Sequence, residues 1–265
     1  MRCMGLVAAC SFLLVAGCAS RFVAVNPATV GPGKCSVLTV LYAKSYFQDR
    51  FMSKTIAFSF VPFGELAVQG VNHDTTGPSR VASSPYEKLL GSFDVLQGVA
   101  TELKASVSDV KYFELKSMGG GDVGTQQKIV AAMASGTGDA DLDRALTTAG
   151  CGCFAALKFS YGLGARRGSE QFGFRKTYRP FIRVWGGIRK AGSSQIVWQD
   201  DLIVFGGKGY LGSESEPENI DRNELVAQFQ QLSKEIVKLL VNVLNGAPKP
   251  EMGELVDNTG RDRSY

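Results

Sequence analysis

Apolar residues recur along the chain with two periods, one of two residues and one of three to four. The first period predicts strands and the second predicts amphipathic helices. Strands are predicted over residues 36–44, 54–62, 110–115, 153–161, 172–189 and 195–205. Helices are predicted over residues 85–105, 126–134, 140–149 and 222–245. The order is therefore β-β-α-β-α-α-β-β-β-α, in which three successive strands precede a closing helix.

This order predicts an α/β (α+β) fold with one mixed, largely antiparallel sheet, helices mainly on one face and a C-terminal amphipathic helix. Residues 190–194 contain a glycine and predict a hairpin turn between the last two strands. Asp221 is a suitable N-cap for the closing helix, with Glu224 three residues later, and Gly246 follows the helix end. These positions fit a capping box and a glycine stop signal.

The N-terminus carries one positive charge, at Arg2, followed by an apolar run over residues 6–15. This layout is typical of a secretory signal, and a run of about ten residues is half the length of a membrane-spanning helix. The run closes with Val15, Ala16, Gly17 and Cys18, two small residues before a cysteine. These four residues resemble the lipobox, the cleavage motif of bacterial lipoprotein precursors.

The resemblance covers residues 1–18 and implies that residues 1–17 are removed as a signal peptide. It also implies that Cys18 receives a diacylglycerol and that its new amino group is acylated, as with palmitate. Two or three acyl chains hold a protein stably on a membrane. Ala19 is not an acidic retention residue, which in well-studied diderm bacteria favours the outer membrane. The alternative is an ordinary signal peptide with an incidental cysteine.

We therefore expect a lipid-anchored protein at the periplasmic face or the surface of the outer membrane. Residues 18–34, rich in proline and glycine, are expected to form the anchor and a tether. Residues 35–246 are expected to form a single α/β domain, since 45% of the chain is hydrophobic and 10% aromatic. Residues 247–265 contain few apolar residues and are expected to form a disordered tail.

Positive charge is concentrated between residues 166 and 190, which contain eight lysines and arginines but only one acidic residue, Glu170. Aromatic residues are interleaved with these cations. Such a strand can bind an anionic lipid or glycan. The candidate ligand-binding residues are Arg175, Lys176, Arg179, Arg183 and Trp185. The alternative is an ordinary solvated strand whose arginines meet acidic neighbours and whose aromatic residues enter the core.

Asp200 and Asp201 are adjacent, so on a strand they face opposite sides and cannot share one substrate atom. We expect them to pair with arginines across the hairpin, such as Arg183 or Arg189. Besides Cys18, three cysteines remain outside the leader. A bridge from Cys35 to Cys151 or to Cys153 is one interpretation, and buried reduced cysteines are the other.

Residues suited to catalysis are few. His73 is the only histidine, and no nucleophile elbow accompanies it. The pattern Gly119-x-Gly121-x-x-Gly124 matches a dinucleotide fingerprint, but its strand is not the first of a βαβ unit. Cys151 and Cys153 lack a second ligand pair for a metal. The sequence therefore predicts no enzyme, no cofactor and no metal.

Two segments of the mature chain resemble a known domain. One is a helix over 141–149, Gly150 and a strand over 153–161; the other is Gln195-Ile196-Val197-Trp198-Gln199-Asp200. They resemble the periplasmic α/β domain of the curli-secretion channel lipoprotein and of lipoproteins that activate peptidoglycan synthases. The resemblance implies a non-enzymatic docking, assembly or accessory component. Its partners would be the membrane, through the lipid, and other envelope proteins, with no nucleic acid.

Overall fold

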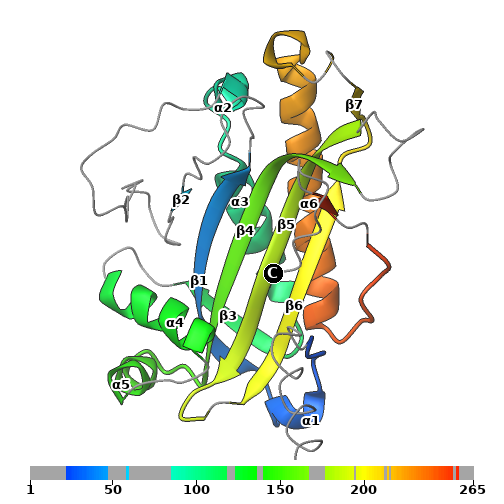
Figure 1. The fold of residues 1–265 in the computed structure, drawn as a ribbon. Helices are drawn as coiled ribbons and strands as arrows, with labels where there is room; N and C mark the ends of the chain where they lie inside the picture. Colours follow the sequence, from blue (N-terminus) through cyan, green and yellow to red (C-terminus); the bar gives the residue numbers. More distant parts are fainter. Residues whose placement is uncertain are drawn as a thin grey trace, which may run out of the picture.

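One mixed sheet forms the centre of the structure (Figure 1). The computed structural model describes residues 22–46, 58–59, 85–117, 123–135, 140–166, 177–193, 195–211, 214, 216–252 and 255–256. The main strand order is β2-β1-β4-β5-β6, with β3 beside β1, β7 beside β5 and β8 beside β4. The bounds are β1 Cys35–Tyr46, β2 Phe58–Ser59, β3 Phe113–Ser117, β4 Cys153–Arg166, β5 Thr177–Lys190, β6 Ile196–Phe205, β7 Tyr210–Leu211 and β8 Leu255–Val256.

The strand directions make the sheet mixed but largely antiparallel. β1 runs parallel to β3 and β4, whereas β4, β5 and β6 follow one another antiparallel. Parallel neighbours require crossover connections, and helices lie in the chain between these strands. The helices are α1 Pro27–Val30, α2 Pro85–Leu90, α3 Val95–Ser106, α4 Val123–Ser135, α5 Ala140–Thr148 and α6 Arg222–Leu244, with 3-10 turns η1 Val107–Asp109 and η3 Pro217–Asn219. The predicted α/β class is confirmed.

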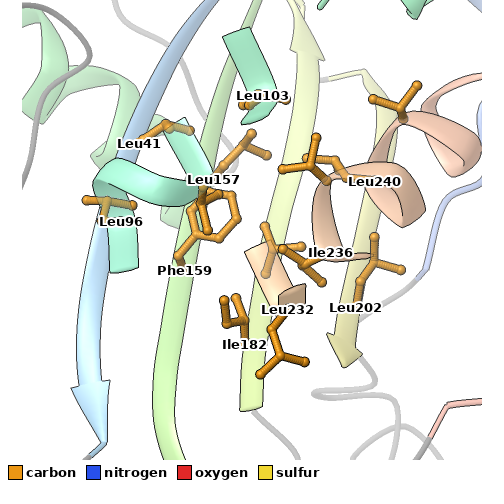
Figure 2. Packing of buried hydrophobic residues seen from close by; sticks show 14 of the residues in the cluster. Leu41, Leu96, Leu103, Leu157, Phe159, Ile182, Leu202, Leu232, Ile236 and Leu240 are labelled. Atoms are coloured by element: carbon orange, nitrogen blue, oxygen red, sulfur yellow. The ribbon is translucent and has the colours of Figure 1, made fainter. Parts of the chain in front are cut away.

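The larger core lies between the sheet and helices α3 and α6 (Figures 1 and 2). Alternate residues of a strand point to opposite faces, so each strand contributes every second side chain to this core. Figure 2 shows contributors from β1, β4, β5, β6 and the two helices: Leu41, Leu157, Phe159, Ile182, Leu202, Leu96, Leu103, Leu232, Ile236 and Leu240. Full burial of each such side chain stabilises the folded state by about 1.5–3 kcal/mol.

A second and smaller core covers the opposite face of the sheet. Leu38 of β1 and Phe154 of β4 point there and pack with Ile129 of α4 and with Leu142 and Leu146 of α5. The register pairs Leu38 with Phe154, which places both side chains on one face. Helices therefore lie on both faces, and the larger cluster is the one beneath α3 and α6.

The helix predicted over 85–105 is two helices, α2 and α3. Gly91 has a φ of 60°, which ends α2, and a Cβ there would lie 2.0 Å from Nη2 of Arg222. Asp94 then starts α3, since its Oδ1 accepts a hydrogen bond of 3.1 Å from the backbone N–H of Gln97. The prediction missed this break because the apolar stripe continues across it.

The closing helix α6 begins and ends close to its predicted bounds. Oδ1 of Asp221 accepts hydrogen bonds from the N–H groups of Asn223 and Glu224, at 2.8 and 3.1 Å. The side chain of Glu224 forms an ion pair of 2.5 Å with Lys208. Gly246, with a φ of 82°, follows the helix. The N-cap and the stop signal were thus correctly predicted.

Candidate functional site

The proposed lipid anchor lies outside the described residues, as do Val15, Ala16 and Gly17. The described chain begins at Phe22, four residues after Cys18. A fully extended chain spans at most about 3.6 Å per residue, so these two Cα atoms lie within about 14 Å of each other.

The described N-terminal segment, which begins at Phe22, is docked on the edge strand β6. Val23 and Gln199 exchange two backbone hydrogen bonds, of 2.9 and 3.0 Å. Val25 is buried in the larger core, and the side chain of Asn26 caps α1 by accepting a bond of 3.0 Å from Ala28. The N-terminal segment is thus part of the fold from its first described residues.

The segment after α6 lies beside the same strand. Nζ of Lys249 lies 2.7 Å from Oδ1 of Asp200 and donates a hydrogen bond of 2.5 Å to the backbone oxygen of Asp201. The backbone N–H of Ile203 points to the sulfur of Met252 at 3.4 Å. The Lys249 ammonium also lies 4.3 Å from the ring centroid of Phe22. The two terminal segments therefore meet at β6.

We use the name β6 edge for the backbone groups of Gln199, Asp201 and Ile203 that point away from β5. Gln199 pairs with the N-terminal segment, and Ile203 meets the C-terminal segment. The N–H of Asp201 donates to Oδ1 of Asp200 at 2.7 Å, while its carbonyl accepts from Lys249. An open edge strand invites pairing with other chains. Both termini of the domain protect this edge.

These contacts bear on two predictions about the ends of the chain, in so far as those ends are described. The anchor and tether were predicted over residues 18–34; residues 18–21 lie outside the described residues, and residues 22–34 carry a β-bridge, a buried valine and the helix α1. A disordered tail was predicted over residues 247–265; within its described part, Lys249 and Met252 contact β6 and β8 pairs with β4, while residues 253–254 and 257–265 lie outside the described residues. Composition misled in both places because these segments dock through a few single residues. The alternation of Val23 and Val25 was the signal that could have revealed the first.

Two arginines of the basic strand, Arg179 and Arg183, bind other groups of the domain. The guanidinium of Arg183 binds the carboxylate of Asp201 through two hydrogen bonds, the one from Nε measuring 2.7 Å. Arg179 donates from Nη1 to the carbonyl oxygens of Gly206, at 3.1 Å, and Gly207. Trp185 is half-buried. Arg175 and Lys176 lie outside the described residues.

The expected pairing with an arginine is confirmed for Asp201 and wrong for Asp200. Asp201 pairs with Arg183, diagonally across the β5–β6 ladder. Asp200, on the other face, pairs with Lys249 from the C-terminal segment. Two of the candidate anion-binding arginines thus serve the fold, which favours the solvated-strand interpretation of this segment over a ligand site.

A disulfide joins Cys35 of β1 to Cys153 of β4, with Cα atoms 6.3 Å apart. The register places Val37 opposite Cys153, so Cys35, two residues earlier, shares the face of its partner. Cys151 is free and buried in the smaller core on the other face. Burial raises the pKa of its thiol, which disfavours the thiolate form.

Within the residues that the structure describes, no three histidine, cysteine or acidic side chains gather as a metal site would require. No helix in that part of the chain is long and apolar enough to cross a bilayer.

No protein-family model matches the chain, and no curated protein matches its sequence. Solved structures with a related arrangement include the hypothetical protein CT253 from Chlamydia trachomatis, at 10% identity and a TM-score of 0.38, covering 80% of this chain and 98% of that one. Another is lipoprotein GNA1162 from Neisseria meningitidis, at 11% identity and a TM-score of 0.27, covering 77% of this chain and 99% of that one. These scores are too low to place the chain in the family of either protein.

Proposed function

We propose that this chain is a lipid-anchored envelope protein without enzymatic activity, whose α/β domain docks with or assists other envelope components. The lipid on Cys18 would hold it at the outer membrane, on the periplasmic face or at the surface. The lipobox at Val15 to Cys18 supports the anchor.

The disulfide between Cys35 and Cys153 is the observation that carries this proposal. Disulfides persist in oxidising compartments such as the periplasm and are rare in the cytosol, where thiols are kept reduced. Both partners of the bridge lie in the folded domain, outside the residues that carry the lipobox resemblance. It therefore supports export independently of the N-terminal motif.

A docking role is supported by the way the domain uses its polar groups. Two predicted ligand-binding residues bind groups of the domain itself: Arg179 donates to carbonyl oxygens just after β6, and Arg183 to the carboxylate of Asp201. This use of charge suits a rigid scaffold that presents surfaces to other proteins. The resemblance to envelope-assembly lipoproteins implies the same role.

The anchor can be tested by growing cells with a clickable fatty acid. The wild-type protein should be labelled and Cys18→Ala should not, because only Cys18 supplies the modified thiol. Cys151→Ala is the matched control: it also removes one cysteine and should be labelled like the wild type. Equal labelling of wild type and Cys18→Ala would reject the anchor.

The docking role can be tested by cross-linking in intact cells, followed by identification of the neighbours. Recovery of the same envelope protein from repeated experiments would support the proposal. The Cys18→Ala variant controls for placement, since a chain released from the membrane should lose a membrane-bound neighbour. Recovery of no envelope neighbour from the anchored protein would reject a docking role.

A further inference from the structure

The strand β3 lies at the other edge of the sheet from β6, beside the start of β1. The backbone N–H of Cys35 donates to the carbonyl oxygen of Tyr112, which fixes the hydrogen-bond pattern of this parallel ladder. In such a ladder, alternate residues of a strand turn their backbone groups toward the neighbouring strand, and the others turn them away. The backbone groups that point away from β1 are those of Phe113, Leu115 and Ser117.

The described chain covers the two edges of the sheet to different extents. Both terminal segments cover the β6 edge, whereas β3 packs mainly against β1 and the turn η1. Within the described residues, no hydrogen bond reaches the outward backbone groups of Phe113 and Leu115. A strand edge with such unpaired N–H and C=O groups can bind a further strand, which continues the ladder.

The side chains of β3 indicate which strand would fit. Glu114 and Lys116 lie on one face of β3, and their side chains are 56% and 40% exposed. Their charged atoms are 3.8 Å apart, and the Glu114 carboxylate also accepts a hydrogen bond of 2.6 Å from the Ser36 hydroxyl. Leu115, between them, packs against the larger core and is only partly buried. The order acid, leucine, base is complementary to itself when two such strands run antiparallel.

We propose that two copies of this chain pair through antiparallel β3 strands, about a twofold axis at Leu115. The outward groups of Leu115 in the two copies then exchange backbone hydrogen bonds, as do those of Phe113 in one copy and Ser117 in the other. Glu114 of one copy lies directly opposite Lys116 of the other, and the twofold symmetry repeats this pair. This inference does not depend on the lipid anchor.

Charge disfavours the neighbouring registers of the same pair of strands. Outward groups must meet outward groups, so one strand can slip along the other only in steps of two residues. A slip in one direction places Glu114 opposite Glu114, and a slip in the other direction places Lys116 opposite Lys116. Like charges directly opposite each other are destabilising. The register centred on Leu115 is therefore the one that pairs opposite charges.

Charge reversal tests this pairing by analytical ultracentrifugation. The parent is the Cys18→Ala chain, which lacks the proposed lipidation site, so that no micelle holds two copies together. It should dimerise reversibly. Glu114→Lys or Lys116→Glu alone should weaken the dimer about tenfold to a hundredfold, because each places like charges opposite each other in both symmetry-related pairs. The two changes in one chain restore opposite charges and should restore dimerisation.

A mixture of the two single variants is the sharpest test. Glu114→Lys gives the strand two cations and Lys116→Glu gives it two anions, so the mixture should form dimers although each variant alone is mainly monomeric. Lys234→Glu, which reverses an exposed charge on α6, is the matched control and should dimerise like the parent. Urea unfolding of each variant should show an unchanged midpoint, since the side chains of Glu114 and Lys116 are exposed.

Two results would overturn the proposal directly: a parent chain that stays monomeric at high micromolar concentration, and a dimer that neither single reversal weakens. Loss of a cross-linked envelope protein from cells carrying a single reversal, with a monomeric parent chain, would assign the β3 edge to another protein and likewise overturn it. None of these results removes the proposed docking function, which the neighbours recovered by cross-linking test separately.

Discussion

Removal of the disulfide should produce the largest loss of stability among the changes considered below. The bridge connects β1 and β4, which are neighbours in the sheet but separated by 118 residues in the chain. Replacing both partners, as Cys35→Ala with Cys153→Ala, leaves no unpaired thiol in the place of the bridge. The hydrogen-bond ladder between the two strands remains available.

The expected magnitude follows from the length of the closed loop. Cross-linking a loop of this length lowers the entropy of the unfolded chain by an amount worth about 5 kcal/mol at 25 °C. Measured losses on removing native disulfides are typically about 2–5 kcal/mol, because the unfolded chain keeps some structure and the native bond some strain. We expect a loss of about 4 kcal/mol, or about 2 M in the urea midpoint at a slope of about 2 kcal/mol per molar.

Urea unfolding can be followed by the fluorescence of Trp198, which is fully buried. The Cys18→Ala chain serves as the background, because it lacks the proposed lipidation site. Cys151→Ala is the matched control, since it removes one buried sulfur and no bridge; it should cost only about 1 kcal/mol. A reductant should lower the midpoint of the background chain and leave the double variant unchanged. A double variant no less stable than Cys151→Ala would refute the reasoning.

Three further changes test particular contacts. Lys249→Met should lower the free energy of unfolding by about 1–2 kcal/mol, because it leaves the buried carboxylate of Asp200 without its cation. The loss is smaller than for a fully buried ion pair because Lys249 is partly exposed. Gly186→Ala should cost about 1–3 kcal/mol through overpacking, because the new Cβ would lie 2.5 Å from a leucine methyl, while Gly207→Ala, in open space, should be neutral in the same urea assay. Ser36→Ala should raise the pKa of Glu114, measured by NMR titration, because the Ser36 hydroxyl donates a bond of 2.6 Å that lowers this pKa.

The last change also has a defined pH dependence. A carboxyl group whose pKa is lowered on folding stabilises the native state above its unfolded pKa, and this stabilisation disappears as the pH falls through the folded value. The benefit of the Ser36–Glu114 bond should therefore be present at neutral pH and absent in acid. A wild type and a Ser36→Ala variant that lose the same stability on acidification would contradict this account.

Periodicity and local end signals were sufficient to predict much of the fold. The stripe of the closing helix, its N-cap at Asp221 and its stop at Gly246 depend only on nearby residues, and α6 matches them. The hairpin of β5 and β6 was predicted for the same reason, with a glycine turn between two long apolar strands. Local patterns are strongest where an element is long and one face of it is buried.

Contacts between distant segments could not be predicted in this way. The choice between Cys151 and Cys153 depends on the register of β1 against β4, which places Cys35 and Cys153 on one face. Similarly, Asp200 pairs with Lys249 rather than with an arginine because the C-terminal segment returns to β6. Sequence patterns describe the face of a strand but not the segment that will lie against it.

The protection of β6 links the anchor to the fold. If the chain between Cys18 and the domain were free, any end of the sheet could approach the membrane, and the β6 edge would be open to other chains. The bridge between Val23 and Gln199 restricts both, because the N-terminal segment covers the β6 edge and also limits how far a lipid on Cys18 could lie from the domain. Lys249 holds the other side of the same site. Cys18, the proposed lipidation site, precedes this bridge by five residues, so a lipid there would act on a fixed point of the domain.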